Sequence, residues 1–325
     1  MQNSRNDFDP KAYNPTFKWK FLLPSNWGTW LLIFITIPIA LLPNSVRCWL
    51  ARLAALLMLK KTSTACKRAW VNLSVCFPTK NRYEKVSIIR NGLTTGGAYL
   101  LGFASLTIRS RHWLEKKCIV QGIENLTKHT DKNENVILLV PHTWTIDVPA
   151  ILFASKGLPV VGFVKQQKNE LGDWLMHKQR IQYGGRIYER SSGIKPFIKS
   201  IKQGYLGYYL PDQDHGPDNS VFVDFFSAIK ATLPGLGKLA KISNAKVVPI
   251  FSSYNVDSGQ YQIDIYPALK NFPTGSDEGD AKATNDYIES VVSRNLEQYM
   301  WNLSLLKTQA DGSNLYKSYL SKDPL

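Results

Sequence analysis

The stretch VILLVPHTWTIDVPA, residues 136–150, decides the fold that this chain is expected to adopt. Its first five residues are apolar and predict a buried strand, which Pro141 ends. His142 follows at once, and Asp147 stands five residues further on, where the sequence becomes apolar again. A titratable base and a carboxylate therefore lie between a strand and a helix, which is where α/β proteins bind their ligands.

The sequence around this stretch alternates between strand and helix patterns from residue 119 onwards. Short apolar runs predict strands at residues 136–140, 159–164, 206–210, 221–226, 246–251 and 261–266. Helices are predicted between them, at residues 145–155, 170–181, 193–203, 230–243 and 280–298. A turn at residues 257–259 makes a hairpin of the last two strands. The pattern indicates an α/β fold, with a mixed, mostly parallel central sheet flanked by helices.

The amino-terminal part of the chain is strongly basic. Residues 10–83 contain eleven Lys or Arg and no Asp or Glu, within a chain whose net charge is +15. Such a block favours an anionic surface, either nucleic acid or anionic lipid. Residues 21–46 inside it carry no charge at all, which favours lipid over nucleic acid.

Residues 21–46 are expected to form a membrane-anchoring helix. A helix over residues 27–43 would be about 26 Å long at ~1.5 Å per residue, close to the ~30 Å hydrocarbon core of a bilayer. Trp27 and Trp30 suit the membrane interface. Pro38 leaves a kinked or re-entrant anchor open beside a single pass, and a buried core helix is the alternative. The basic run at residues 47–68 places the larger part of the chain in the cytoplasm.

His142 and Asp147 are the first candidates for catalysis. A carboxylate beside an imidazole fixes its tautomer, and the free ring nitrogen can then act as a general base near neutral pH. The sequence lacks the GxSxG pattern of a serine nucleophile, so the proton would come from a substrate hydroxyl. The alternative is a structural histidine whose hydrogen bonds are satisfied within the core.

Two further stretches carry candidate binding residues. In YGGRIYERSSGIKPF, residues 183–197, Gly184 and Gly185 allow close backbone approach, and Arg190 offers a guanidinium group to phosphate or carboxylate. In YYLPDQDHGPDNSVFVDFF, residues 208–226, Asp212 and Asp214 follow a predicted strand. Ordinary turns are the alternative for both stretches. No metal site is predicted, because this loop matches no known ligand pattern and the four cysteines have no CxxC spacing.

Taken together, these stretches resemble the bacterial lipid A late acyltransferases of the lysophospholipid acyltransferase superfamily. The resemblance covers nearly the whole chain and includes NLSVCFP at 72–78, VPHTWTIDVPA at 140–150, GGRIYERSSGIKPFI at 184–198, GYYLPDQDHGPDNSVFVDFF at 207–226 and EQYMWNLSLLKT at 297–308. The HxxxxD/E dyad of the family falls on His142 and Asp147, its arginine on Arg190, and its PDxD carboxylates on Asp212 and Asp214. The PDQDHGP and WNLSLLKT versions are most similar to the member that adds the last secondary chain, usually myristoyl.

The resemblance implies transfer of a myristoyl or lauroyl chain from acyl carrier protein to a 3-hydroxyacyl hydroxyl of a Kdo-bearing lipid A precursor. His142 would be the general base, oriented by Asp147, and no cofactor is required. The implied partners are acyl carrier protein, the lipid A precursor and the membrane, with no nucleic acid. The implied location is the cell inner membrane.

The expected organisation follows. It comprises a polar leader at 1–20, an anchor at 21–46, a helical membrane-surface region at 47–118, an α/β acyltransferase domain at 119–310 and a tail at 311–325. Two other functions are kept as alternatives. One is an acyl-CoA-dependent glycerolipid acyltransferase, which a donor-competition assay would distinguish. The other is a non-enzymatic, membrane-anchored basic binding protein, which salt-sensitive nucleic-acid binding would support.

Overall fold

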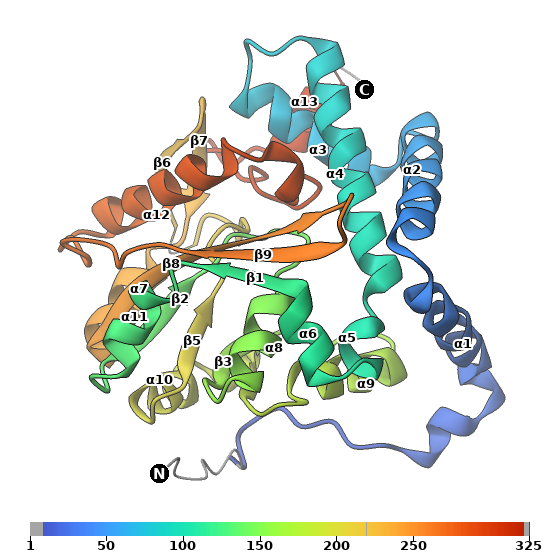
Figure 1. Cartoon of the computed structure of the whole chain (residues 1–325). Helices are drawn as coiled ribbons and strands as arrows, with labels where there is room; N and C mark the ends of the chain where they lie inside the picture. Colours follow the sequence, from blue (N-terminus) through green and yellow to red (C-terminus); the bar gives the residue numbers. More distant parts are fainter. Residues whose placement is uncertain (1–8, 219, 322–324) are drawn as a thin grey trace.

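The computed structural model describes residues 9–218, 220–321 and 325, and Figure 1 shows their arrangement. The main sheet has seven strands among the described residues, in the order β1-β9-β8-β2-β5-β3-β4. Its neighbours pair in parallel except β8 and β9, which form an antiparallel hairpin. The mixed, mostly parallel sheet is thereby confirmed. The strands are β1 (Cys118–Gln121), β2 (Asn135–Leu139), β3 (Val160–Val164), β4 (Arg186–Glu189), β5 (Leu206–Tyr209), β8 (Ala245–Asn255) and β9 (Gln260–Ile265).

Strand β2 lies inside the sheet and is covered on both faces. Ile137 and Leu139 enter one hydrophobic core, whereas Val136 and Leu138 enter a second core on the opposite face. A strand that is buried on both faces is apolar throughout rather than alternating, which explains the continuous run that opens the signature stretch. The first core packs against α10 (Lys195–Lys202), α11 (Gly235–Ser243) and α12 (Asp277–Val292), and the second includes residues of α8 (Asp147–Ser155).

The amino-terminal helices lie together at one side of the sheet (Figure 1). They are α1 (Trp27–Leu41), α2 (Asn44–Lys60), α3 (Thr64–Cys76), α4 (Arg82–Gly102) and α5 (Ser105–Ile108), preceded by the short turns η1 (Trp19–Leu22) and η2 (Pro24–Asn26). The stretch Pro24–Leu41 is long and apolar enough to cross a membrane, and only 6% of it is buried. Both ends of α1 nevertheless touch the rest of the protein: Asn169 donates to Thr29, and Ser105 donates to the Ala40 carbonyl.

The structure differs from the expected elements in three places. Strands β1 and β4 were not expected, because their sequences, CIVQ and RIYE, contain only short apolar runs. The helix predicted from residue 230 begins at Gly235, because β7 (Ala228–Thr232) pairs with β6 (Val221–Phe225) in a separate antiparallel hairpin. The helix predicted to reach residue 298 ends at Val292 and is followed by η4 (Leu296–Gln298). The remaining elements are α6 (Arg111–Lys117), α7 (Glu124–Thr130), α9 (Glu170–Arg180), η3 (Arg190–Ser192) and α13 (Leu315–Leu320).

Candidate active site

The loop that carries His142 is fixed by a segment near the carboxyl terminus. The backbone N–H of Met300 donates to the His142 carbonyl at 2.9 Å, and that of Trp144 donates to the Gln298 carbonyl at 3.2 Å. The Trp144 ring lies against Gly96 of α4, where even a Cβ atom would come within 2.3 Å of it. Backbone bonds on one side and a tightly packed ring on the other therefore hold this loop in one conformation.

His142 is paired with Asp212. The backbone N–H of His142 donates to Asp212 Oδ2 at 2.7 Å, and the imidazole Nδ1 contacts Asp212 Oδ1. Asp212 follows β5, the parallel neighbour of β2, so the ends of the two strands bring the residues together. An ionised carboxylate only accepts hydrogen bonds, so Nδ1 carries the ring proton and Nε2 is left as a potential base.

Asp212 is held in its charged form inside the protein. Its side chain is fully buried, which by itself would raise its pKa. The adjacent His142 and the hydrogen bonds from His142 outweigh this burial and keep the pKa of Asp212 below its usual value. The side chain of His142 is 12% exposed. The pair thus joins a buried anion to an imidazole that is partly accessible.

Asp147 has a different partner from the one that the sequence spacing predicted. Its Oδ1 accepts from Arg180 Nε at 2.7 Å, and its Oδ2 accepts from Arg180 Nη2 at 3.4 Å. Asp147 begins α8 and Arg180 ends α9, so the ion pair joins these two helices. The prediction that Asp147 orients the His142 ring is therefore corrected, since Asp212 occupies that position.

Replacing Asp147 with Asn should destabilise the protein by about 1.5–3 kcal/mol, because Arg180 would keep its charge at a largely buried site without its counter-ion. The side chains of Asp147 and Arg180 are only 18% and 25% exposed. Asp286→Asn is the matched control, since Asp286 pairs with Lys282 on the surface of α12, where such pairs contribute about 0.5 kcal/mol. Urea denaturation compares the two variants, and equal losses of stability would contradict the role given to the Asp147 pair.

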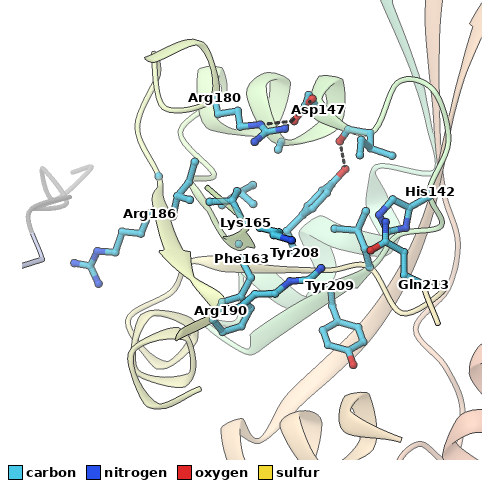
Figure 2. Close-up of a pocket in the computed structure, with 18 of the residues that line it drawn as sticks. His142, Asp147, Phe163, Lys165, Arg180, Arg186, Arg190, Tyr208, Tyr209 and Gln213 are labelled. Carbon is cyan, nitrogen blue, oxygen red and sulfur yellow. Dashed lines mark hydrogen bonds and ion pairs between the residues drawn. The ribbon is translucent and has the colours of Figure 1, made fainter. Parts of the chain in front are cut away.

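His142 opens into a cleft of about 880 Å³ at the ends of β2, β3, β4 and β5 (Figure 2). Polar and charged residues share the lining with apolar ones. The polar side chains in the lining are His142, Asp147, Lys165, Gln167, Arg180, Arg186, Arg190, Tyr208, Tyr209, Gln213 and His215. The size and mixed character of the cleft suit a substrate that has both a fatty chain and a polar group.

Of the other predicted binding residues, three line this cleft, and Asp214 instead forms hydrogen bonds within the protein. Gly184, Gly185 and Arg190 line the cleft. Both glycines have positive φ, and a Cβ on Gly185 would come within 2.8 Å of the Val160 carbonyl oxygen, so they are required for the turn into β4. Asp214 lies outside the lining and accepts from the backbone and hydroxyl of Thr308, at 2.6 and 2.9 Å. It fastens the carboxyl-terminal segment beside the site.

The family model for the bacterial lipid A biosynthesis acyltransferases matches residues 14–308. The chain belongs to this family. It is therefore an acyltransferase of lipid A biosynthesis, and a lipid A precursor is its implied substrate. This excludes the non-enzymatic binding protein that was kept as an alternative.

Several relatives of this lipid A biosynthesis acyltransferase match over nearly their whole length. The myristoyltransferase of Escherichia coli K12 is 39% identical, covering 99% of this chain and 98% of its own. A lipid A biosynthesis acyltransferase of Haemophilus influenzae Rd is 38% identical, covering 94% and 95%. The lauroyltransferase of E. coli K12 is 28% identical, covering 92% and 97%.

Sequence reasoning missed two charged residues of this acyltransferase. Arg180 was not singled out, because its partner lies 33 residues earlier and no local pattern joins them. Lys230 on β7 is fully buried, and burial lowers its pKa to about 8, although Asp212 and Asp214 favour its charged form. A lysine in the run AIKAT gives no signal of burial, since lysines usually lie on the surface.

Proposed function

We propose that this acyltransferase moves a myristoyl or lauroyl chain from acyl carrier protein to the hydroxyl of a 3-hydroxyacyl chain on a Kdo-bearing lipid A precursor. The reaction would be the last secondary acylation of lipid A biosynthesis. One observation carries the proposal: an imidazole whose Nδ1 is held by a buried carboxylate lies at the wall of a large cleft that both apolar and cationic residues line.

The chemistry would be direct acyl transfer. Nε2 of His142 takes the proton of the acceptor hydroxyl while its oxygen attacks the thioester carbonyl carbon. The tetrahedral intermediate collapses, the carbon–sulfur bond breaks, and His142 returns the proton to the leaving thiolate. A new ester and a free thiol result, and the enzyme is regenerated. Asp212 stabilises the imidazolium that forms between the two proton transfers.

Arg190 is proposed to bind the anionic part of the acceptor or the developing oxyanion. It lies in the same lining as His142, and its Nη1 is 3.5 Å from Nδ1 of His215. A guanidinium group only donates hydrogen bonds and stays charged, so it suits phosphate and carboxylate groups. Gly184 and Gly185 bring the backbone close to the same part of the cleft.

The test is a transfer assay with the purified full-length chain, a Kdo-bearing lipid A precursor and either acyl carrier protein or coenzyme A as carrier of the same chain. Mass spectrometry of the lipid should show one added chain, formed faster from the carrier protein. Equal or faster transfer from coenzyme A would overturn the proposed donor. Transfer of the acyl chain to a glycerolipid but not to the lipid A precursor would contradict the proposed acceptor.

The enzyme is proposed to sit at the cell inner membrane through α1 and the exposed face of α2, with the α/β part in the cytoplasm. Large apolar side chains on these helices face outward, including Trp27, Leu31, Phe34, Trp49 and Leu57, which are 57–66% exposed. Exposed apolar surface of this extent on adjacent helices is typical of a membrane contact. The contacts at both ends of α1 favour a helix that lies along the protein, as in a re-entrant anchor.

Replacing Leu31 and Leu57 with Glu should weaken binding to anionic vesicles by at least about tenfold, because burying each leucine contributes about 1.5–3 kcal/mol. Ile242→Glu is the control, since Ile242 is 56% exposed on α11, away from α1 and α2. Vesicle flotation measures the bound fraction. Unchanged flotation of the double variant would place the membrane contact elsewhere.

A further inference from the structure

Gly162 is a glycine in the middle of β3 that has no packing reason to be one. Apart from its two chain neighbours, a Cβ atom built there would meet only Tyr208 Cβ within 4 Å among the described residues, at 3.8 Å, which is an ordinary contact. Its φ is not positive. Gly207 on the next strand is a contrast, because a Cβ there would come within 2.8 Å of Ile201. A glycine inside a strand weakens the strand, and it often marks the close approach of a ligand.

The space beside Gly162 belongs to the cleft that contains His142. Tyr208 is paired with Gly162 across the sheet, and its hydroxyl donates to the Ile146 carbonyl at 2.5 Å, which fixes the ring beside α8. Figure 2 shows this ring between the Asp147–Arg180 pair and Arg190. The neighbouring wall is apolar and is formed by the side chains of Ile146, Ala150, Val160, Val164 and Ile181. We call this part of the cleft the Gly162 limb.

The remainder of the cleft has a different chemistry. Arg190, Gln213 and His215 line it, and Tyr209 belongs to the opposite face of the sheet from Tyr208. Cationic and hydrogen-bonding groups suit the phosphates and sugars of a lipid A precursor. The Gly162 limb has an apolar wall, and two of the charged side chains beside it, Asp147 and Arg180, are paired with each other, so an unbranched hydrocarbon chain fits it better. Lys165 also lines the cleft.

We propose that the Gly162 limb holds the acyl chain that is transferred, and that the missing side chain at residue 162 sets the length of chain accepted. The inference rests on the proposed function, because it concerns the donor chain of that same reaction. A side chain added at residue 162 would fill the limb from the β3 side. Longer acyl chains would then no longer fit in the limb, whereas shorter acyl chains would still fit with their thioester beside His142.

The test compares Gly162→Ala and Gly162→Leu with the wild-type full-length enzyme, using decanoyl, lauroyl, myristoyl and palmitoyl carrier protein. One methylene in an apolar pocket changes kcat/KM by about 10–200-fold. The Leu variant should therefore shift the ratio of decanoyl to myristoyl transfer by at least about tenfold towards decanoyl. The Ala variant should shift it in the same direction by less.

Gly28→Leu is the matched control, because a Cβ built on Gly28 would likewise meet no atom at less than an ordinary contact distance, and Gly28 lies in α1, outside the cleft. Its chain-length ratio should stay that of the wild type. If Gly162→Leu transfers no chain, Gly162→Ala decides, and an unchanged ratio in that variant overturns the inference. Failure of the wild-type enzyme to transfer any chain would instead overturn the proposed function.

Discussion

Replacement of His142 with Asn should lower kcat/KM for acyl transfer by about 10²–10⁴-fold, the usual contribution of a positioned general base. The amide of Asn can still donate towards Asp212, but it has no basic nitrogen to take the hydroxyl proton. The backbone N–H of residue 142 keeps its bond to Asp212 Oδ2. The loss should therefore fall on kcat more than on KM, with little change in thermal stability.

His142→Ala tests the same role without the amide. It leaves the fully buried Asp212 without its side-chain partner, so it should also destabilise the protein, by about 1–3 kcal/mol. His129→Asn is the matched control, because Nδ1 of His129 on α7 lies 2.5 Å from Oε2 of Glu134, which follows that helix, in a comparable pair. That variant should keep full activity. Wild-type activity in His142→Asn would end the proposed mechanism.

Replacement of Asp212 with Asn should reduce transfer by about the same factor, because it changes which ring nitrogen of His142 carries the proton. The backbone N–H of His142 needs an acceptor, so the amide oxygen of Asn would face it. The amide nitrogen would then donate to Nδ1 and move the ring proton to Nε2. His142 would face the cleft with a hydrogen atom instead of a lone pair. The same exchange in a serine protease triad lowers kcat by about 10⁴-fold.

The pH dependence of stability tests the charged state of Asp212 itself. The pKa of Asp212 is lower in the folded protein than in the unfolded chain, so its ionised form stabilises the fold above the unfolded value of 3.8. This contribution disappears as the pH falls through the lowered pKa. Asp212→Asn should therefore flatten the acid side of the stability profile. Identical acid profiles for Asp212→Asn and the wild type would contradict the charged state assigned to Asp212.

The general architecture could be predicted because its causes are local. The apolar run before Pro141 is visible in the sequence, and so is the position of His142 at the end of that strand. The turn at residues 257–259 likewise gives the β8–β9 hairpin. Short strands such as β4 were missed because they are stabilised by neighbours that are distant in sequence, namely β3 and the Tyr13 backbone N–H, which donates to Ile187.

The partner of His142 could not be found from spacing. Asp147 is five residues away and Asp212 is 70 residues away, so the sequence favoured the nearer carboxylate. The order of strands decides otherwise, because β5 pairs directly with β2 and delivers Asp212 to the imidazole. The side chain of Asp147 points to α9, whose position depends on tertiary packing. The pairing of β5 with β2 identifies Asp212 as the partner, and this pairing is known only from the structure.

The hydrogen bonds from residues 298–300 to the His142 loop also bear on when the protein becomes active during its synthesis. Residues 142 and 300 must both have left the ribosome before these bonds can form. The proposed membrane contact of α1 and α2 can therefore form long before the chain is able to modify any lipid. A premature stop before residue 298 should leave an inert polypeptide that still carries the proposed membrane contact.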